Sequence, residues 1–313
     1  MWTSNTRSTS GPVSRNTMTM DTTRRQFLVH AALVGAALTL PACARSADAP
    51  STTTPTMRIS LQLFSVREDC RKDFDATLAA VAAAGFAGVE FAGYHGYAGR
   101  PADLRRRLAD LGLVAAGTHI GAASLRGEAL AKTIDFHREL GCRYLIIPHD
   151  QGAVHPDQSK ALADLLNQAS EQLVPAGLAC GYHNHEAEMK IADGDRTWWD
   201  LLAQRTSPAV VLQQDCGWTA MAGRDPAAFI RRYPGRSRIL HFKPTVVRAE
   251  TARADRTPIL GRDSVDWKAV VAACREVGGT EWATIEQERC PTGVTPMDAA
   301  RSSLDALRRI MAV

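Results

Sequence analysis

Two histidines stand two residues apart at the end of a short apolar run, in the segment Cys180-Gly-Tyr-His-Asn-His-Glu186. On an extended strand, side chains at positions i and i+2 lie on the same face, so His183 and His185 direct both imidazoles at one small volume. A single histidine on a strand is commonly only a half-buried, hydrogen-bonded side chain. The pair therefore indicates a functional site only if the rest of the chain places other reactive side chains beside it.

Ionisable side chains stand at the ends of seven of the eight apolar segments that we interpret as strands. These residues are Glu90, His119, His149, His183 with His185, Asp215, His241 with Lys243, and Glu286 with Glu288. Strand alternation places the two members of each pair on one face. Solvated loops supply single residues of this kind by chance, but they explain the whole set poorly. The sequence thus predicts a site assembled from many strand ends.

The predicted cluster contains His, Asp and Glu but no thiolates. Such a set suits a divalent cation of the Mn, Mg, Co or Zn kind and does not distinguish among them. A cation of this kind can bind neighbouring oxygens of a hydroxy-carbonyl compound and stabilise the charge that develops when a carbon-bound proton leaves. A carboxylate or imidazole beside it would serve as the base. Isomerisation, epimerisation and elimination share this first step, so all three stay open.

Apolar strands and amphipathic helices alternate from Met57 to the end of the chain. We expect strands at 58–64, 88–93, 113–120, 142–149, 180–186, 210–215, 239–243 and 283–288, with 188–191 as an extension of the fifth. We expect helices at 73–84, 101–111, 127–140, 157–174, 198–203, 226–233, 266–277 and 295–311. Eight strands, each followed by a helix, predict an α/β fold, a (β/α)8 TIM barrel in a single domain over residues 57–313. In such barrels the C-terminal ends of the strands carry the active site.

The first 56 residues have a different pattern. Thr23-Arg-Arg-Gln-Phe-Leu28 precedes an uncharged stretch at 31–40 and the segment Leu40-Pro-Ala-Cys43. The apolar stretch is much shorter than the roughly 20 residues of a membrane span. We therefore predict an export signal over residues 1–44, followed by a flexible tether at 45–56.

The details of this signal indicate a route of export. The paired arginines resemble a twin-arginine (Tat) signal, and the segment ending at Cys43 resembles a lipoprotein cleavage box. Acylation of Cys43 and simple cleavage near Ala44 both stay open. We expect an exported, periplasmic protein, for which a lipid anchor at Cys43 would be the only link to a membrane.

Charge argues against nucleic acid as a partner. Residues 1–56 contain five arginines and two aspartates, and so carry +3 of the net charge of +4. The remaining domain is close to neutral and has no basic stripe interleaved with aromatic residues. The cluster Arg105-Arg-Arg107 lies on a predicted helix opposite Leu104, Leu108 and Leu111, which is typical of a solvated face.

Cysteine spacing excludes one kind of metal site. The chain has seven cysteines and no CxxC pair, so zinc-knuckle spacing is absent. Export permits disulfides. Cys70 and Cys290, which we expect on loops at the same rim of the barrel, are a candidate pair.

Several segments carry a family resemblance. They are Leu61-Gln-Leu-Phe-Ser-Val-Arg67, Gly88-Val-Glu-Phe-Ala-Gly-Tyr94, Gly181-Tyr-His-Asn-His185, Gln214-Asp215, Tyr233-Pro-Gly-Arg236, Leu240-His-Phe-Lys243, Val265-Asp-Trp267 and Ile285-Glu-Gln-Glu288. Through them the chain resembles the sugar phosphate isomerase/epimerase family, the xylose-isomerase-like TIM barrels, along nearly all of residues 57–313. The family includes isomerases, epimerases, dehydratases and related lyases.

The resemblance implies roles for individual residues. Family metal sites commonly use Glu, Asp, His and Glu from strands five to eight, and by position Asp215, His241 and Glu286 match the last three. The first carboxylate is replaced here by the pair of histidines, of which we expect His183 on the metal, with His185 as the alternative ligand. We expect catalytic roles for Glu286, His185 and Glu90, and substrate contacts from His119, His149, Lys243 and Glu288. Pro244, where Asp is usual, and Gly261-Arg-Asp263, where Gly-acid-Gly is usual, depart from the pattern.

These observations favour an exported, divalent-metal-dependent sugar isomerase or epimerase that abstracts a proton next to a carbonyl. Its substrate would be a small sugar or keto-sugar. A lyase or hydrolase acting on keto-sugars or keto-glycosides is the first alternative, and a non-catalytic carbohydrate-binding lipoprotein is the second. A phosphodiesterase resembling the AP endonucleases would need more His and Asp ligands and a basic surface. The sequence leaves open whether the chain forms a homo-oligomer.

Overall fold

The computed structural model describes residues 57–248, 253–255, 258–277 and 279–313. All of them lie in one compact unit, residues 52–313. The predicted export signal, Cys43 and the predicted tether lie outside the described residues. Among the helices of the described ranges, none has the length and apolar character that crossing a membrane requires.

Eight parallel strands form the central sheet. They are β1 (Arg58–Gln62), β2 (Gly88–Phe91), β3 (Val114–His119), β4 (Tyr144–Ile147), β5 (Ala179–His183), β8 (Val211–Gln213), β9 (Ile239–Phe242) and β12 (Trp282–Ile285). Their order is β8-β5-β4-β3-β2-β1-β12-β9. A parallel bridge between Asp215 and His241 joins the two outer members and closes the ring. The predicted (β/α)8 barrel is thus confirmed.

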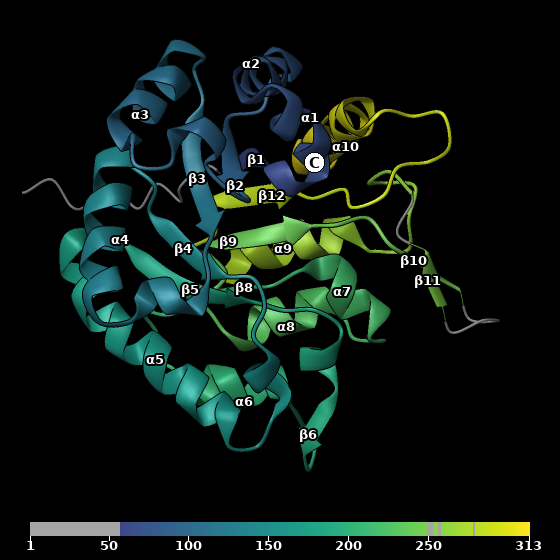
Figure 1. Ribbon diagram of the computed structural model, residues 1–313. Coiled ribbons are helices and arrows are strands. Elements are labelled where there is room, and N and C mark those ends of the chain that lie inside the picture. Colours follow the sequence, from purple (N-terminus) through teal and green to yellow (C-terminus); the bar gives the residue numbers. More distant parts are fainter. Residues whose placement is uncertain (1–56, 249–252, 256–257, 278) are drawn as a thin grey trace, which may run out of the picture. The chain divides into compact units, whose positions relative to one another are not determined.

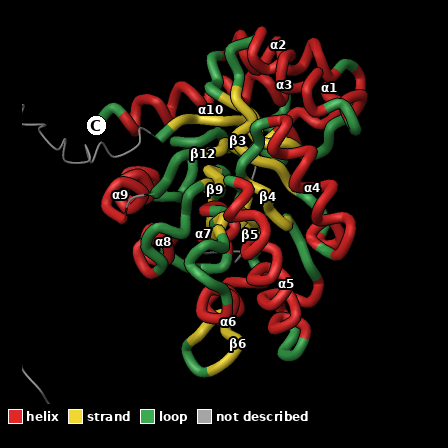
Figure 2. The backbone as a smooth tube through the Cα atoms, turned by 90° about the vertical axis from the view of Figure 1, so that its left-hand side faces the viewer, coloured by secondary structure: helices red, strands yellow, loops and turns green. Residues whose placement is uncertain are grey.

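Helices surround the strands, as Figures 1 and 2 show. They are α1 (Arg67–Lys72), α2 (Phe74–Ala84), α3 (Pro101–Asp110), α4 (Gly127–Leu140), α5 (Gln158–Leu173), α6 (Trp198–Arg205), α7 (Cys216–Met221), α8 (Pro226–Arg232), α9 (Trp267–Val277) and α10 (Pro296–Met311). Local signals in the sequence set their ends. The Asp73 side chain caps α2 by accepting the N–H of Ala76, and Gly85 ends the helix at a φ of 93°.

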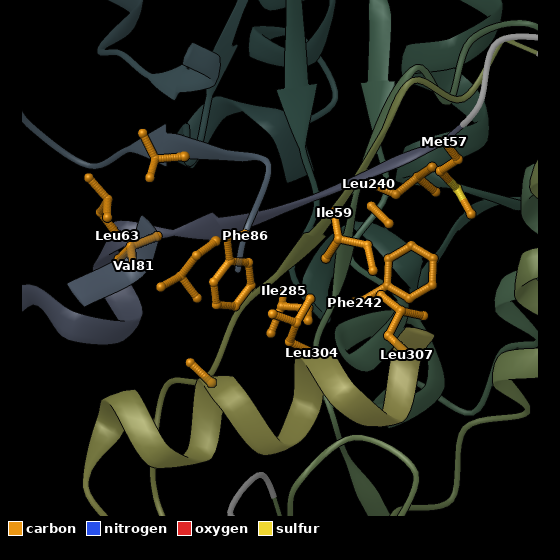
Figure 3. Close-up of a cluster of buried hydrophobic side chains, with 14 of the residues drawn as sticks. Met57, Ile59, Leu63, Val81, Phe86, Leu240, Phe242, Ile285, Leu304 and Leu307 are labelled. Atoms are coloured by element: carbon orange, nitrogen blue, oxygen red, sulfur yellow. The ribbon is translucent and has the colours of Figure 1, made fainter. Parts of the chain in front are cut away.

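Apolar side chains from the strands and the outer helices form the core. Figure 3 shows Leu304 and Leu307 of α10 directed toward Ile285 of β12 and Phe242 of β9, and all four are fully buried. Close packing of this kind holds α10 against β12 and β9. Between β5 and β8 the contact is closer still, because a Cβ at Gly181 would lie 2.3 Å from the carbonyl oxygen of Val211.

Several connections differ from the sequence prediction. The fifth strand does not extend over 188–191, because Ala187–Met189 form a 3-10 turn, and β6 (Ile191–Asp193) pairs with β7 (Arg196–Thr197) as a separate hairpin. That hairpin lies at the bottom of Figure 1. A second hairpin, β10 (Val246–Arg248) with β11 (Arg253–Asp255), follows β9. The short helix α7 directly after β8 was also not predicted.

The proposed disulfide is wrong in this structure. Cys70 and Cys290 are both free thiols. Cys70 lies in α1 rather than on a loop, and its Sγ is directed at the carbonyl oxygen of Leu63, 4.0 Å away. Burial raises the pKa of this thiol to about 11, so it stays protonated at neutral pH.

Candidate active site

Four side chains that are far apart in the sequence meet at the C-terminal ends of the strands. One ligand atom each from His183, Asp215, His241 and Glu286 lies within 4.8 Å of the others, and all four residues are buried. Asp215 Oδ2 is 3.8 Å from His183 Nε2 and 3.9 Å from His241 Nδ1, and His241 Nδ1 is 2.8 Å from Glu286 Oε2. The strand ends therefore bring together the four residues predicted as metal ligands.

Asp215 directs one of its carboxylate oxygens at two other strand-end imidazoles. Its backbone N–H donates to Asn184 Oδ1 at 2.9 Å, and its Oδ1 caps α7 by accepting the N–H of Trp218 at 2.9 Å. Its other oxygen, Oδ2, is buried and accepts no hydrogen bond from a described residue, but it forms an ion pair with Lys243 Nζ, 3.1 Å away. Burial raises the pKa of Asp215 to about 6, against the opposing effect of Lys243. A buried carboxylate oxygen that lies among two imidazoles and a second carboxylate fits a divalent cation.

His183 presents a free nitrogen to the same point. Its Nδ1 lies 3.0 Å from Gln213 Oε1, and a carbonyl oxygen can only accept, so Nδ1 donates the proton. Nε2 then keeps its lone pair on the side of Asp215. Burial, reinforced by the charge of His241, holds the pKa of His183 well below its usual value. A neutral imidazole whose far nitrogen is fixed by a hydrogen bond is the usual form of a metal-bound histidine.

His241 lies between two carboxylates. Its Nε2 is 2.5 Å from Glu90 Oε2, and its Nδ1 is 2.8 Å from Glu286 Oε2. Burial opposes the charged ring, but the two carboxylates outweigh burial and raise the pKa of His241 to about 10. A cation at Nδ1 would therefore replace a proton.

Lys243 brings a positive charge to the same carboxylates. Its Nζ is 3.1 Å from Asp215 Oδ2, 3.1 Å from Glu286 Oε2 and 2.9 Å from Glu288 Oε1. Burial of the ammonium group is unfavourable, but these carboxylates outweigh it and raise the pKa of Lys243 above its usual range. In turn Lys243 and His241 outweigh burial and hold the pKa of Glu286 below its usual range. Lys243 also lies over the ring of Trp218, 5.0 Å from its centroid.

A buried layer of amide and carboxylate groups lies behind the cluster. Gln213 Nε2 donates to Glu90 Oε1 at 2.6 Å, and Gln62 Nε2 donates to Glu90 Oε2 at 2.8 Å. Glu90 is wholly buried, so it contacts His241 rather than open space. Burial acts to raise the pKa of Glu90, but the charges of His241 and His119 outweigh burial and hold this pKa below its usual value. Its role as a catalytic base stays a prediction, and its geometry is that of a group that orients His241.

Sequence reasoning assigned no role to Gln213 or Gln62. Gln213 lies on the same strand face as Asp215, and this alternation was a signal that could have indicated Gln213 as a site residue. Gln62 ends the first strand, which was the only predicted strand without an ionisable end.

The other predicted residues lie around the cluster. His119 Nε2 is 2.9 Å from Gln213 Oε1, and its ring stacks on that of His241 at 5.3 Å. The ring of His185 is 5.1 Å from that of His183, and the exposed His149 lies 5.8 Å from His185 at the rim. Burial, together with Lys243, lowers the pKa of His185 to about 4, so this imidazole is neutral at pH 7.

A comparison with known families matches residues 78–310 to the model of the xylose isomerase-like TIM barrel. The chain belongs to this family. The family resemblance seen in the sequence is thereby confirmed, and the barrel described above is the fold that the family's description names.

Individual relatives agree with this assignment. The chain is 25% identical to an inosose dehydratase of Geobacillus kaustophilus (strain HTA426) over 248 residues, which cover 67% of this chain and 79% of the relative. A crystal structure of a sugar phosphate isomerase/epimerase from Parabacteroides distasonis ATCC 8503 superposes with a TM-score of 0.67 at 25% identity, covering 80% of this chain and 98% of the other. The IolI protein, solved with a bound zinc atom, shares the fold with a TM-score of 0.63 at 14% identity, over 82% of this chain and 98% of its own.

Proposed function

We propose that the protein is a divalent-metal-dependent enzyme that removes a carbon-bound proton next to the carbonyl group of a sugar or keto-sugar. The observation that carries the proposal is the buried Oδ2 of Asp215, which lies among ligand atoms of His183, His241 and Glu286. A bound cation of the Mn, Mg, Co or Zn kind would supply a Lewis acid for the substrate oxygens. The mixed nitrogen and oxygen set does not select among these metals.

His185 is the proposed proton acceptor. Its ring is neutral at pH 7, and its buried Nδ1 has no hydrogen-bond partner among the described residues. A base must be deprotonated and within reach of the carbon that loses the proton. Glu286 is ionised at neutral pH because Lys243 and His241 lower its pKa. An ionised carboxylate can bind a cation and also accept a proton, so we propose both roles for Glu286.

The remaining residues would bind and orient the substrate. Lys243 would donate to the oxygen on which negative charge develops, because its ammonium group is buried and already oriented. Glu288 would hold Lys243 in that position through their 2.9 Å contact. His119 and the exposed His149 would contact hydroxyl groups of the substrate.

The fate of the deprotonated substrate separates two candidate reactions. Return of the proton at another position or face gives an isomerase or epimerase, which the sugar phosphate isomerase/epimerase relative supports. Loss of a neighbouring hydroxyl group gives a dehydratase, a lyase reaction, which the inosose dehydratase relatives favour. The two share every residue named above.

One experiment tests these proposals together. Protein loaded in turn with each of the four metals is incubated in D2O with free sugars, keto-sugars, 3-keto-glycosides and inosose, and the mixtures are followed by NMR. Deuterium at the carbon next to the carbonyl, together with a new isomer, supports the isomerase or epimerase. Deuterium or substrate loss with an unsaturated product supports the lyase.

The controls use the candidate cluster itself. Asp215→Asn should abolish exchange, whereas Asp164→Asn, at an exposed position on α5, should not change it. Sugar binding without exchange or product under every metal would overturn the enzymatic proposal in favour of the carbohydrate-binding protein.

We further propose that the protein is exported through its paired arginines and held at a periplasmic membrane surface by a lipid on Cys43. The support is the pattern of residues 23–43 alone. Arg24→Lys with Arg25→Lys should retain the protein in the cytoplasmic fraction of a host with the twin-arginine system. Cys43→Ser should move exported protein from the membrane to the soluble periplasmic fraction, and an unchanged distribution would exclude the lipid.

A further inference from the structure

A second group of metal-ligating side chains lies beside the candidate centre and shares no residue with it. One ring nitrogen of His149, one of His185 and one carboxylate oxygen of Glu188 lie within 4.8 Å of one another. The residues come from the connection after β4 and the turn after β5. The rings of His183 and His185 are 5.1 Å apart, so the two groups are neighbours at the same end of the barrel.

Glu188 is buried and held in a fixed orientation. Its Oε1 accepts the hydroxyl of Tyr182 at 2.9 Å, and its Oε2 accepts the backbone N–H of His185 at 2.8 Å. Each carboxylate oxygen has a second lone pair, and carboxylates that bind metals are commonly oriented by such hydrogen bonds.

The carboxyl group of Glu188 has no ion-pair partner among the residues that the structure describes. The side chain is almost wholly buried, with 3% of the residue exposed, and within the described residues no side-chain nitrogen of Lys, Arg or His lies within ion-pairing distance of it. Burial of a carboxylate is costly unless a cation or a metal compensates for it.

His185 also has a polar atom whose hydrogen-bonding capacity is unsatisfied among the described residues. Its Nδ1 is buried and has no hydrogen-bond partner in the described part of the chain. An unsatisfied polar atom in an ordered strand end requires an explanation, and an ion is one. His149 is exposed, so the group is open to solvent on one side. Ions from solution can therefore reach it.

We propose that His149, His185 and Glu188 bind a second divalent ion of the zinc kind. Two imidazoles and one carboxylate, with a further position left to water, form a set that suits zinc or cobalt better than magnesium. This group is more exposed than the group of His183, Asp215, His241 and Glu286, so its ion would exchange with solution more readily.

The second ion has a consequence that rests on the proposed function. A histidine bound to a metal cannot accept a proton from substrate, so occupation of this group withdraws His185 from proton transfer. Zinc in excess of one equivalent would then inhibit the enzyme.

Zinc titration of the metal-free, full-length protein tests the site by calorimetry, without any assay of activity. The wild-type protein should bind two equivalents, His149→Ala one and Asp215→Asn one. His155→Ala, which removes an exposed histidine from the same connection, should bind two. Glu188→Gln should weaken the more exchangeable site at least about 100-fold, because it removes a ligand charge. Circular dichroism establishes that each variant is folded.

The outcomes are distinguishable. Two equivalents in the wild-type protein, one of which is lost in His149→Ala, support the site. A single equivalent that persists in His149→Ala overturns it, whether or not that protein turns over a sugar. For the inhibitory role, the ratio of exchange rates with and without excess zinc, at saturating manganese, should fall about tenfold or more in the wild-type protein and stay near one in His149→Ala. Equal ratios in the two proteins would reject the inhibitory role.

Discussion

Lys243 places an ammonium group on the two carboxylates that a divalent cation would share. Its Nζ is 3.1 Å from both Asp215 Oδ2 and Glu286 Oε2. In the absence of a metal this charge offsets the repulsion between two buried carboxylates. When a cation binds, the ammonium group is a like charge at short range. The same residue therefore stabilises the empty centre and opposes its occupation.

Lys243→Met should separate these two effects. Two unit charges 4 Å apart interact by about 4 kcal/mol in a protein-like dielectric, so we expect affinity for Mn to rise about tenfold or more. The metal-free protein should at the same time become less stable, because Asp215 and Glu286 lose their counter-charge. Calorimetry and thermal unfolding in a chelator measure the two quantities. Lys268→Met, on the surface of α9, is the control, and a fall in metal affinity would contradict the argument.

Glu90 acts through His241. We expect Glu90→Gln to weaken metal binding by about 10- to 100-fold, the usual effect of losing a group that orients a ligand. The amide keeps the shape of the side chain but removes the charge that contacts His241 Nε2 at 2.5 Å. Metal affinity of this variant is compared with that of Glu171→Gln, an exposed residue of α5. Equal affinity in the two variants would show that Glu90 only fills space.

The sequence predicted which charged residues would lie close together, because a charge at the end of an apolar strand is unusual. Asp215, His241 and Glu286 each follow such a run, so the barrel itself predicts that they meet. The sequence did not indicate Gln213 or Glu188 as site residues, for different reasons. A neutral amide carries no signal of charge, and Glu188 belongs to a turn that was interpreted as an extended strand.

At the scale of elements, helices with caps and apolar periodicity were predicted closely. The expected helix at 127–140 coincides with α4, and the expected helix at 101–111 exceeds α3 by one residue. Helix α7 was missed because its six residues include Gly217 and are too few to show a period. The hairpin β6–β7 has a turn signal in Asp193-Gly194, but its strands are too short to alternate visibly.

Helix α6 depends on a charged contact with α8. Thr197 and Asp200 form a capping box, and Asp200 also accepts hydrogen bonds from Arg232 at 2.9 Å and from the hydroxyl of Tyr233. Burial acts to raise the pKa of Asp200, but the hydrogen bonds from Tyr233 and Thr197 outweigh it and hold the pKa below its usual value. The carboxylate thus stabilises the folded protein in its ionised form.

Asp200→Asn should lower the free energy of unfolding by about 1–3 kcal/mol at pH 7. The unfolded pKa is about 3.9 and the folded one is lower, so the stabilisation is complete above pH 4 and is lost as the pH falls through the folded value. The difference between variant and wild type should therefore shrink in acid. Urea unfolding at several pH values measures it. Asp73→Asn, at the exposed cap of α2, should change stability by only a few tenths of a kcal/mol. A difference that is constant with pH would refute the role of the charge.

For the whole molecule, the barrel explains why the fold could be predicted and the substrate could not. Each of the eight parallel strands contributes to one ring, so the alternation of these strands with helices determines the architecture. The substrate depends instead on side chains at the rim and on connections such as the one that carries Arg262 and Asp263. Those segments have no periodic pattern, and similar proteins include both an isomerase/epimerase and a dehydratase.

The ring of strands is completed by the bridge between Asp215 and His241, which are also two of the four proposed metal ligands. A bound ion would link the ends of β8 and β9 through these two residues. Removing the ion should therefore weaken the barrel first between β8 and β9. Hydrogen exchange after chelation should accelerate at the amides of β8 and β9 and leave those between β2 and β3 on the opposite wall unchanged. Uniform acceleration around the ring would show that ion binding does not specifically stabilise the pairing of β8 with β9.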